Sequence, residues 1–333
     1  MDSGSRIAIV GVGEVGGAIA YNLTLGSIAS ELLLVELDLN LRNAQVEDLS
    51  DVAYSTGSST RVRSATYGEA AQSDIVVITA ASKHTLGTGW TIVIIICNLS
   101  DIMLTSLTIG QNTIDCTSRN TSMIREVMDA MKPFRSDTIL LVVANPVDLL
   151  TSIAQGMSGL PKSQVIGSGT SLDTSRLRRM VASRGSVSPS SIGAFVVGVH
   201  GEDQVTAWST ATVGAVPISE VHMFSALDRA RIDSTYKHRS RVITQGKGSA
   251  VFGIASISAN LCCSILLDKR EISPVCHFQP KFDCCLSMPA IIGRKGILST
   301  LHLSLDDQEQ AAIAASAKHL KDRIEWIQKY WWL

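Results

Sequence analysis

Three ionisable residues in the second half of the chain have the types and spacing that a proton-transfer site needs. Asp173 and Arg176 occur in "SLDTSRLR", and His200 follows in "VVGVHGEDQVTAW". Histidine titrates near neutral pH, so His200 is the candidate general acid and base. A carboxylate such as Asp173 can hold the imidazole in one tautomer and stabilise its charged form. The guanidinium of Arg176 can bind a carboxylate through two parallel hydrogen bonds.

A second group of residues, near the N-terminus, predicts a turn that binds phosphate. Gly11, Gly13 and Gly16 form the pattern "GVGEVG" directly after the apolar run "RIAIV". The first glycine permits a tight turn, the second lets the backbone approach a pyrophosphate, and the third lets a helix pack closely. The N-terminus of that helix offers free N–H groups to the phosphates. Val15, inside the turn, is also predicted to contact the cofactor.

The residues that end two later apolar runs complete the predicted cofactor site. Glu36 ends "LLLVE", about 20 residues after the glycines, where a carboxylate binds the ribose hydroxyls of a dinucleotide. A carboxylate there repels a 2′-phosphate, so the pattern favours NAD over NADP. Asp38 is the alternative if the strand ends later. Asn145 follows "TILLVVA" and is expected beside the nicotinamide, where it would contact both cofactor and substrate.

These residues need a parallel sheet to bring them together. Short apolar runs alternate with helix-compatible segments through the first half of the chain, at residues 6–10, 32–36, 74–80, 138–144 and 164–167. This alternation predicts an α/β fold with a doubly wound parallel Rossmann sheet. We place this NAD-binding domain at residues 1–168.

The second half, residues 169–333, is predicted to be a mixed α+β domain that binds the substrate and carries the catalytic residues. A long helix is expected over residues 228–267, broken near two glycines at 246 and 248. A final amphipathic helix is expected over 306–330. Strands are expected at residues 191–199, 211–218, 274–278, 284–292 and 297–305.

The overall composition excludes several classes of protein. The chain has 333 residues, 45% of them hydrophobic, and a net charge of −1, which argues against a nucleic-acid partner. The start of the chain lacks a basic region followed by an apolar one, so we expect no secretory signal and a cytoplasmic protein. The seven cysteines form no C-x-x-C pattern, which argues against a disulfide framework and a metal site.

Five motifs together resemble the L-lactate dehydrogenase and malate dehydrogenase family, on the lactate side. They are "GVGEVG", "ANPVDLLT", "GSGTSLDTSRLR", "GVHGEDQVTAWS" and "IIGRKGI", in this order. The resemblance implies that NADH passes a hydride to the keto carbon of a small 2-oxo acid while His200 supplies a proton. It also implies a homo-oligomer, a dimer or a tetramer. Lactate and pyruvate are the expected substrates, with malate-type activity as the alternative.

Two positions depart from the family pattern in the loop that closes over the substrate. Thr113 stands where the family has an arginine that polarises the substrate carbonyl, and His84 stands at the position that discriminates substrates. Losing a preorganised donor typically costs about 10²–10³ in rate. A catalytically impaired NAD-binding relative is therefore a further alternative. Neutral His84 would favour a monocarboxylate, and protonated His84 would tolerate oxaloacetate.

The same loop carries an apolar stretch that does not fit the family. Joining Gly87 directly to Gln111 gives "ITAASKHTLGQNTIDCTSRN", which follows the family pattern without a gap. Residues 88–110 are thus predicted to be an insertion, either a translated intron or a lineage-specific segment. Its continuous apolar core, residues 92–96, is too short for a membrane span, which needs about 20 residues.

Overall fold

The computed structural model describes residues 4–80 and 106–331, with side chains described for residues 4–80 and 119–329. His84 and most of the predicted insertion lie outside the described residues. Thr113 falls within a helix, but its side chain is not described. No described helix is both long enough and apolar enough to cross a lipid bilayer.

The main feature is a nine-stranded sheet that begins as a parallel Rossmann sheet and ends in three antiparallel strands. The order across the sheet is β14-β13-β12-β6-β5-β4-β1-β2-β3. The parallel strands are β1 (Arg6–Val10), β2 (Glu31–Val35), β3 (Arg61–Ser64), β4 (Ile75–Ile78), β5 (Ile139–Val142) and β6 (Val165–Gly167). The antiparallel strands are β12 (Glu271–Gln279), β13 (Cys284–Gly293) and β14 (Gly296–Thr300). The predicted fold class is confirmed.

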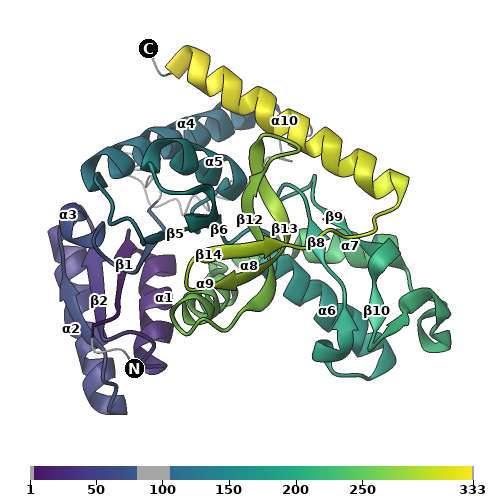
Figure 1. The fold of residues 1–333 in the computed structure, drawn as a ribbon, viewed down its shortest axis with the longest axis horizontal. Coiled ribbons are helices and arrows are strands. Elements are labelled where there is room, and N and C mark those ends of the chain that lie inside the picture. The colour runs from purple at the N-terminus through teal and green to yellow at the C-terminus, as the bar shows by residue number, and fades with distance from the viewer. Residues whose placement is uncertain (1–3, 81–105, 332–333) are drawn as a thin grey trace.

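Helices cover both faces of this sheet, as the short apolar strands require (Figure 1). On one face lie α4 (Ser106–Met131), α5 (Val147–Ser158) and α10 (Asp307–Trp331). On the other lie α1 (Glu14–Leu25) and α9 (Val251–Leu266), which pack against each other. Beside the first strands lie α2 (Leu39–Thr56) and the single-turn α3 (Tyr67–Ala70).

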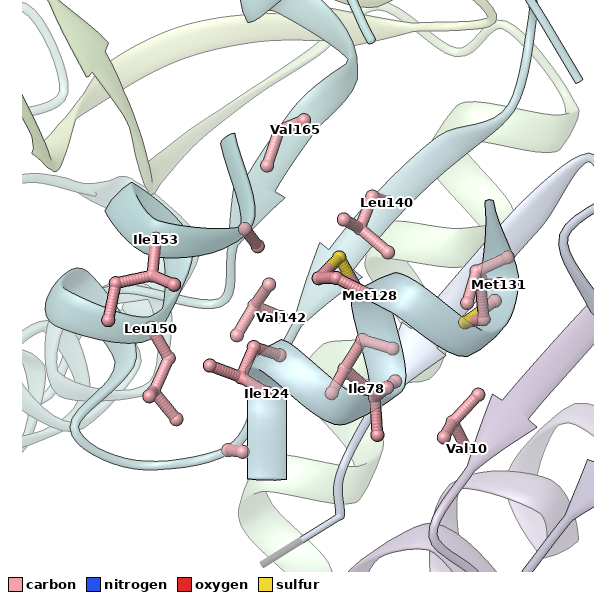
Figure 2. Packing of buried hydrophobic residues seen from close by; sticks show 14 of the residues in the cluster. Val10, Ile78, Ile124, Met128, Met131, Leu140, Val142, Leu150, Ile153 and Val165 are labelled. Atoms are coloured by element: carbon pink, nitrogen blue, oxygen red, sulfur yellow. The ribbon is translucent and has the colours of Figure 1, made fainter. Parts of the chain in front are cut away.

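Alternate residues of each parallel strand enter two separate cores. In β1, Ile7 and Ile9 pack toward α1 and α9, whereas Val10 packs toward α4 and α5. Figure 2 shows this second core, in which Ile124 and Met128 of α4 contact the central strands. Because both cores share the same strands, the carboxyl ends of those strands are held in a fixed arrangement.

A smaller lobe is built around a third core and contains the remaining elements. Its helices are α6 (Ser171–Gly185), α7 (Arg229–Lys237) and α8 (Arg239–Lys247). Its short strands are β7 (Ile192–Gly193), β8 (Val196–Val197), β9 (Val205–Thr206), β10 (Thr212–Val213) and β11 (Val216–Pro217). Its single 3-10 turns are Pro189–Ser191, Trp208–Thr210, Ile218–Glu220 and His222–Phe224. Another 3-10 turn, Lys162–Gln164, lies outside this lobe, just before β6, and packs against β12 and β14.

Several elements differ from the sequence predictions. The helix predicted over residues 228–267 has its predicted break at Gly248, whose φ of +89° ends α8, and a second, unpredicted break at His238, so it forms three helices. The strand predicted over 211–218 is two short strands, β10 and β11. The predicted strand 191–199 is two short strands, because β7 pairs with β10 and β8 pairs with β9 in a different sheet. The strand predicted over 297–305 stops at Thr300, and β3, a four-residue polar strand, was not predicted.

The sheet also joins the two halves of the chain. Strand β12 pairs with β6 through Cys276 and Gly167, so β12, β13 and β14 extend the Rossmann sheet. Local sequence patterns place these strands in the second domain, because strand pairing across a long separation leaves no local signal. The boundary at residue 168 stays a prediction.

Candidate active site

The candidate site lies at the carboxyl ends of the parallel strands. Strand β1 pairs in parallel with β2 on one side and with β4 on the other. From β1 the later strands β2 and β3 extend the sheet in one direction, and β4, β5 and β6 extend it in the opposite direction. In open α/β sheets, ligands bind at such a switch point, beyond the carboxyl ends of the strands. The glycine turn follows β1 directly at this point.

The three glycines have different environments, and each environment explains why a glycine is present. Gly11 has a φ of +91°, and a Cβ there would lie 2.5 Å from the backbone of Ala80. A Cβ on Gly16 would lie 2.0 Å from the carbonyl oxygen of Gly11. A Cβ on Gly13, by contrast, would meet no atom of the described residues within 4 Å. Gly11 and Gly16 are therefore needed for packing, whereas the space beside Gly13 is open.

The open space at Gly13 fits the pyrophosphate of a dinucleotide. Gly13 is the residue that precedes α1, and among the described residues no side chain caps the first turn of this helix. The first N–H groups of α1 are thus left for a ligand, and an anion there is stabilised by the helix dipole. Val15 packs in part against the core on the α1 side, so its predicted contact with the cofactor stays a prediction.

Glu36, and not Asp38, faces the glycine turn. The Glu36 carboxylate accepts hydrogen bonds from the backbone N–H of Val12 at 3.1 Å and of Leu37 at 2.9 Å. Asp38 instead caps α2, because its side chain accepts from the N–H groups of Asn40 and Leu41. This geometry favours Glu36 as the ribose-binding residue and assigns Asp38 a structural role.

The three residues of the predicted proton-transfer site lie together. The Nδ1 atom of His200 lies 2.9 Å from Oδ2 of Asp173, and the Asp173 side chain is only 2% exposed. Asp173 and Arg176 occupy neighbouring positions on α6, and Nη1 of Arg176 is 3.5 Å from Oδ1 of Asp173. His200 follows β8, in the turn toward β9. The hydrogen bond to Nδ1 leaves Nε2 as the ring nitrogen that can face a substrate.

The electrostatics of this cluster favour a charged imidazole. Burial by itself lowers the pKa of His200, but the charge and hydrogen bond of Asp173, together with the charge of Asp148, raise the pKa to about 9. Arg176 opposes this rise. Solvent reaches 27% of the His200 side chain, which screens part of these interactions. At neutral pH the ring is therefore a proton donor.

Arg176 is a buried guanidinium in a region of positive charge. Burial lowers its pKa, Asp173 raises it, and the nearby Arg239 and Arg179 lower it further. Together with residues of α8 and α9, these three arginines line a cavity of about 270 Å³. Besides its contact with Asp173, the Arg176 guanidinium can donate hydrogen bonds to a carboxylate of a ligand.

The remaining predicted residues are placed only in part. Asn145 is exposed just after β5, and its carbonyl oxygen accepts a hydrogen bond from Nδ2 of Asn120 at 2.9 Å. Its contacts with cofactor and substrate stay predictions. His84 and the side chain of Thr113 lie outside the described residues. In the described part of the chain, no group of three His, Cys, Asp or Glu side chains is arranged to hold a metal ion.

One acidic residue at this site was not predicted from the sequence. Asp148, in the first turn of α5, is 2% exposed, and its Oδ2 atom accepts a hydrogen bond from the backbone N–H of His200 at 2.8 Å. The signal was present in "ANPVDLLT", where Asp148 is the single charge in an apolar segment. Its partner is 52 residues away in the sequence, so only the fold reveals the contact.

Comparison with known protein families supports the same interpretation over nearly the whole chain. A family model described as lactate/malate dehydrogenase, NAD binding domain, matches residues 5–89 and 105–167. A second, described as the α/β C-terminal domain of the same family, matches residues 170–330. The chain belongs to the lactate/malate dehydrogenase family. Within this family it lies on the lactate side, and its cofactor is NAD.

Individual relatives and solved structures agree with this assignment. L-lactate dehydrogenase A of Rhizopus oryzae is 37% identical over 317 residues, which cover 95% of this chain and 91% of that protein. An L-lactate dehydrogenase of Allorhizobium ampelinum is 36% identical, with 95% and 97% covered. The ligand-bound minor L-lactate dehydrogenase of Enterococcus mundtii superposes with a TM-score of 0.85 at 27% identity, covering 98% of this chain and 99% of that one.

The predicted enzyme class is therefore confirmed. The chain is an L-lactate dehydrogenase-like, NAD-dependent 2-hydroxy-acid oxidoreductase, and the malate-type alternative is not favoured by these relatives. The match to the NAD-binding domain is interrupted between residues 89 and 105. This interruption falls inside the predicted insertion, whose boundaries and origin stay predictions.

Proposed function

We propose that this protein interconverts pyruvate and L-lactate with NAD(H), using Asp173, Arg176 and His200 as its reacting and binding groups. The observation that carries the proposal is the buried Asp173 carboxylate, which holds His200 at 2.9 Å while Arg176 lies one helical turn away. A proton donor next to a carboxylate-binding guanidinium suits a small 2-oxo acid, which has a ketone beside a carboxylate.

Each residue has a distinct role in this proposal. Arg176 binds the substrate carboxylate through paired hydrogen bonds and so orients the ketone toward His200. His200, charged at neutral pH, donates its Nε2 proton to the ketone oxygen as that oxygen gains negative charge. Asp173 keeps Nδ1 protonated and stabilises the charged ring before transfer. When bound, NADH supplies the hydride that the keto carbon accepts.

The predicted cofactor residues support the binding of NAD in an extended form across the switch point. Gly13 and the N-terminus of α1 would hold the pyrophosphate, and Glu36 would accept from the ribose hydroxyls. Asn145, at the end of β5, would lie beside the nicotinamide. Thr113, in place of an arginine, removes a donor to the carbonyl oxygen, so we expect turnover slower than in relatives with that arginine.

We also propose a cytoplasmic homo-oligomer. The resemblance to the family supports the assembly, and five cysteines within the described residues are free thiols, as a reducing compartment permits. Exposed apolar side chains on α2 and α9, among them Tyr54 at 91% and Phe252 at 73% exposure, are available for contacts between subunits. Sedimentation of the purified chain measures the assembly directly.

Steady-state NADH oxidation tests the proposed reaction. We expect the wild-type chain to turn over pyruvate faster than oxaloacetate, and we expect His200→Asn to lower kcat by about 10²–10⁴ because it removes the proton donor. His238→Asn is the matched control, since His238 is an exposed histidine paired with Glu202 at 3.4 Å. Binding of NADH without turnover of pyruvate by the wild type would overturn the proposal.

A further inference from the structure

Asp148 is a buried carboxyl group that the proposed reaction does not place in contact with substrate or cofactor. It lies in the first turn of α5, close to Asn145, and its side chain has almost no access to solvent. Burying a carboxyl group costs free energy unless hydrogen bonds compensate for the lost water. Such a group persists in a core when it makes a contact that an apolar residue cannot make.

The surroundings of Asp148 leave His200 as its principal partner. Oδ2 accepts from the backbone N–H of His200, whereas Oδ1 accepts from no N–H or O–H group among the described residues. The thiol of Cys276 also donates to the carboxyl group. The groups that face it are the charge of His200 and the thiols of Cys276, Cys284 and Cys285 on β12 and β13. Burial raises the pKa of Asp148, and His200 and Cys276 partly counter this rise.

The backbone around His200 needs an external anchor. Gly198 and Gly201 flank it with φ values of +86° and +118°, a conformation that glycine adopts at little cost. Gly198 is fixed by a pair of backbone hydrogen bonds with Ser287 of β13, at 2.8 and 2.9 Å. The Asp173 contact fixes the ring, and the Asp148 contact is the one that fixes the amide of His200 itself.

We propose that Asp148 is a positioning residue that holds the backbone of His200, so that the imidazole is presented to the substrate in one orientation. Two carboxyl groups on two helices then fix the position of His200. Asp173 of α6 holds the imidazole ring, and Asp148 of α5 holds the backbone N–H. Because α5 begins next to Asn145, the same helix turn links the predicted nicotinamide site to the proton donor. This inference rests on the proposed function for its kinetic consequence only.

Two substitutions at Asp148 distinguish the effect of its hydrogen bond with the His200 amide from the effect of its negative charge. Asp148→Asn keeps an acceptor oxygen of the same shape, whereas Asp148→Ala removes it and leaves the His200 amide without a partner. We expect Asp148→Ala to lower kcat by about 10- to 100-fold, with KM for pyruvate and the Kd of NADH nearly unchanged. Asp148→Asn should recover most of this loss. Asp203→Asn, at an exposed position three residues after His200, is the control.

Hydrogen exchange of the His200 amide tests the same contact without turnover. The amide should be protected in the wild type and in Asp148→Asn, and should exchange at least about 10-fold faster in Asp148→Ala. Equal protection in all three proteins, or equal kcat for Asp148→Ala and wild type, would overturn the inference. An inactive wild type would refute the proposed reaction, and the exchange result would still decide the role of Asp148. If the alanine variant fails to fold, Asp148→Asn and Asp148→Ser are compared instead.

Discussion

At the scale of single residues, His200 is held between opposing influences. Burial is the largest single influence and disfavours its charged form, but the charge and hydrogen bond of Asp173 at 2.9 Å, together with the charge of Asp148, outweigh burial. The result is a proton donor at neutral pH whose ring and backbone are each fixed by a different acid. This arrangement has a consequence for stability as well as for chemistry.

The raised pKa of His200 predicts how the free energy of unfolding depends on pH. The folded pKa of about 9 lies above the unfolded value of about 6.5, so the charged ring stabilises the fold fully below about pH 6.5. This stabilisation is lost as the pH rises from about 6.5 through about 9. We expect the difference in unfolding free energy between wild type and His200→Asn, measured in urea, to shrink across this range. A difference that stays constant would contradict the shift.

Arg176 leads to a second prediction, on substrate affinity. Because two parallel hydrogen bonds to a carboxylate depend on the planar guanidinium, Arg176→Lys should raise KM for pyruvate by about 10-fold and Arg176→Gln by about 100-fold. The exposed Arg184, in the last turn of α6, offers the control Arg184→Lys. Initial rates over a range of pyruvate concentrations give both constants. An unchanged KM in Arg176→Gln would remove Arg176 from the substrate site.

At the scale of elements, the turn between β1 and α1 separates ligand binding from packing. A methyl group on Gly13 meets no atom within 4 Å in the part of the chain that the structure describes, whereas one on Gly16 overlaps the Gly11 carbonyl. We expect Gly13→Ala to weaken NADH binding more than about 10-fold while changing the unfolding free energy by less than about 0.5 kcal/mol. Gly16→Ala should weaken binding and also destabilise the fold by about 1–3 kcal/mol.

Fluorescence titration with NADH and urea unfolding measure these two quantities. Each variant is the control for the other, because both add one methyl group to the same turn. Unweakened binding in Gly13→Ala would show that the open space at this residue is not where the pyrophosphate lies. Equal stability of the two variants would mean that α1 can shift away from the strand.

Most elements of the Rossmann half were predictable from local patterns, and those of the small lobe were less so. Buried parallel strands such as β4 are continuous apolar runs, which the sequence displays directly. The strands of the lobe have two residues each, and their ends are set by which partner they pair with. The helix break at His238 likewise has no proline or glycine to announce it.

At the scale of the whole molecule, the predicted insertion is the feature with the largest expected effect. The family model matches residues on both sides and leaves 90–104 unmatched, as expected if a segment has been added to the loop. An apolar segment in a loop that must close over the substrate would slow turnover. We expect a variant lacking residues 88–110 to have a higher kcat with pyruvate than the full chain.

Peptide mapping of the native protein tests whether this segment is translated. If residues 88–110 derive from an intron, trypsin should release "HTLGQNTIDCTSR" and no peptide that contains Trp90. Detection of a Trp90 peptide in the native protein would end the intron hypothesis and favour a lineage-specific insertion. The kcat comparison would then show whether that insertion restrains the enzyme.

The sequence by itself determined the class of fold, the glycine turn and the three residues Asp173, Arg176 and His200. Strand runs and glycine spacing are local patterns, and the motifs together carry the family resemblance. Only the tertiary structure decided that Glu36 rather than Asp38 faces the turn, and that Asp148 accepts a hydrogen bond from the backbone N–H of His200. It also decided that β12 joins β6 and continues the first sheet. Each of these contacts depends on the three-dimensional placement of strand ends and helix starts, which residue spacing along the chain does not specify.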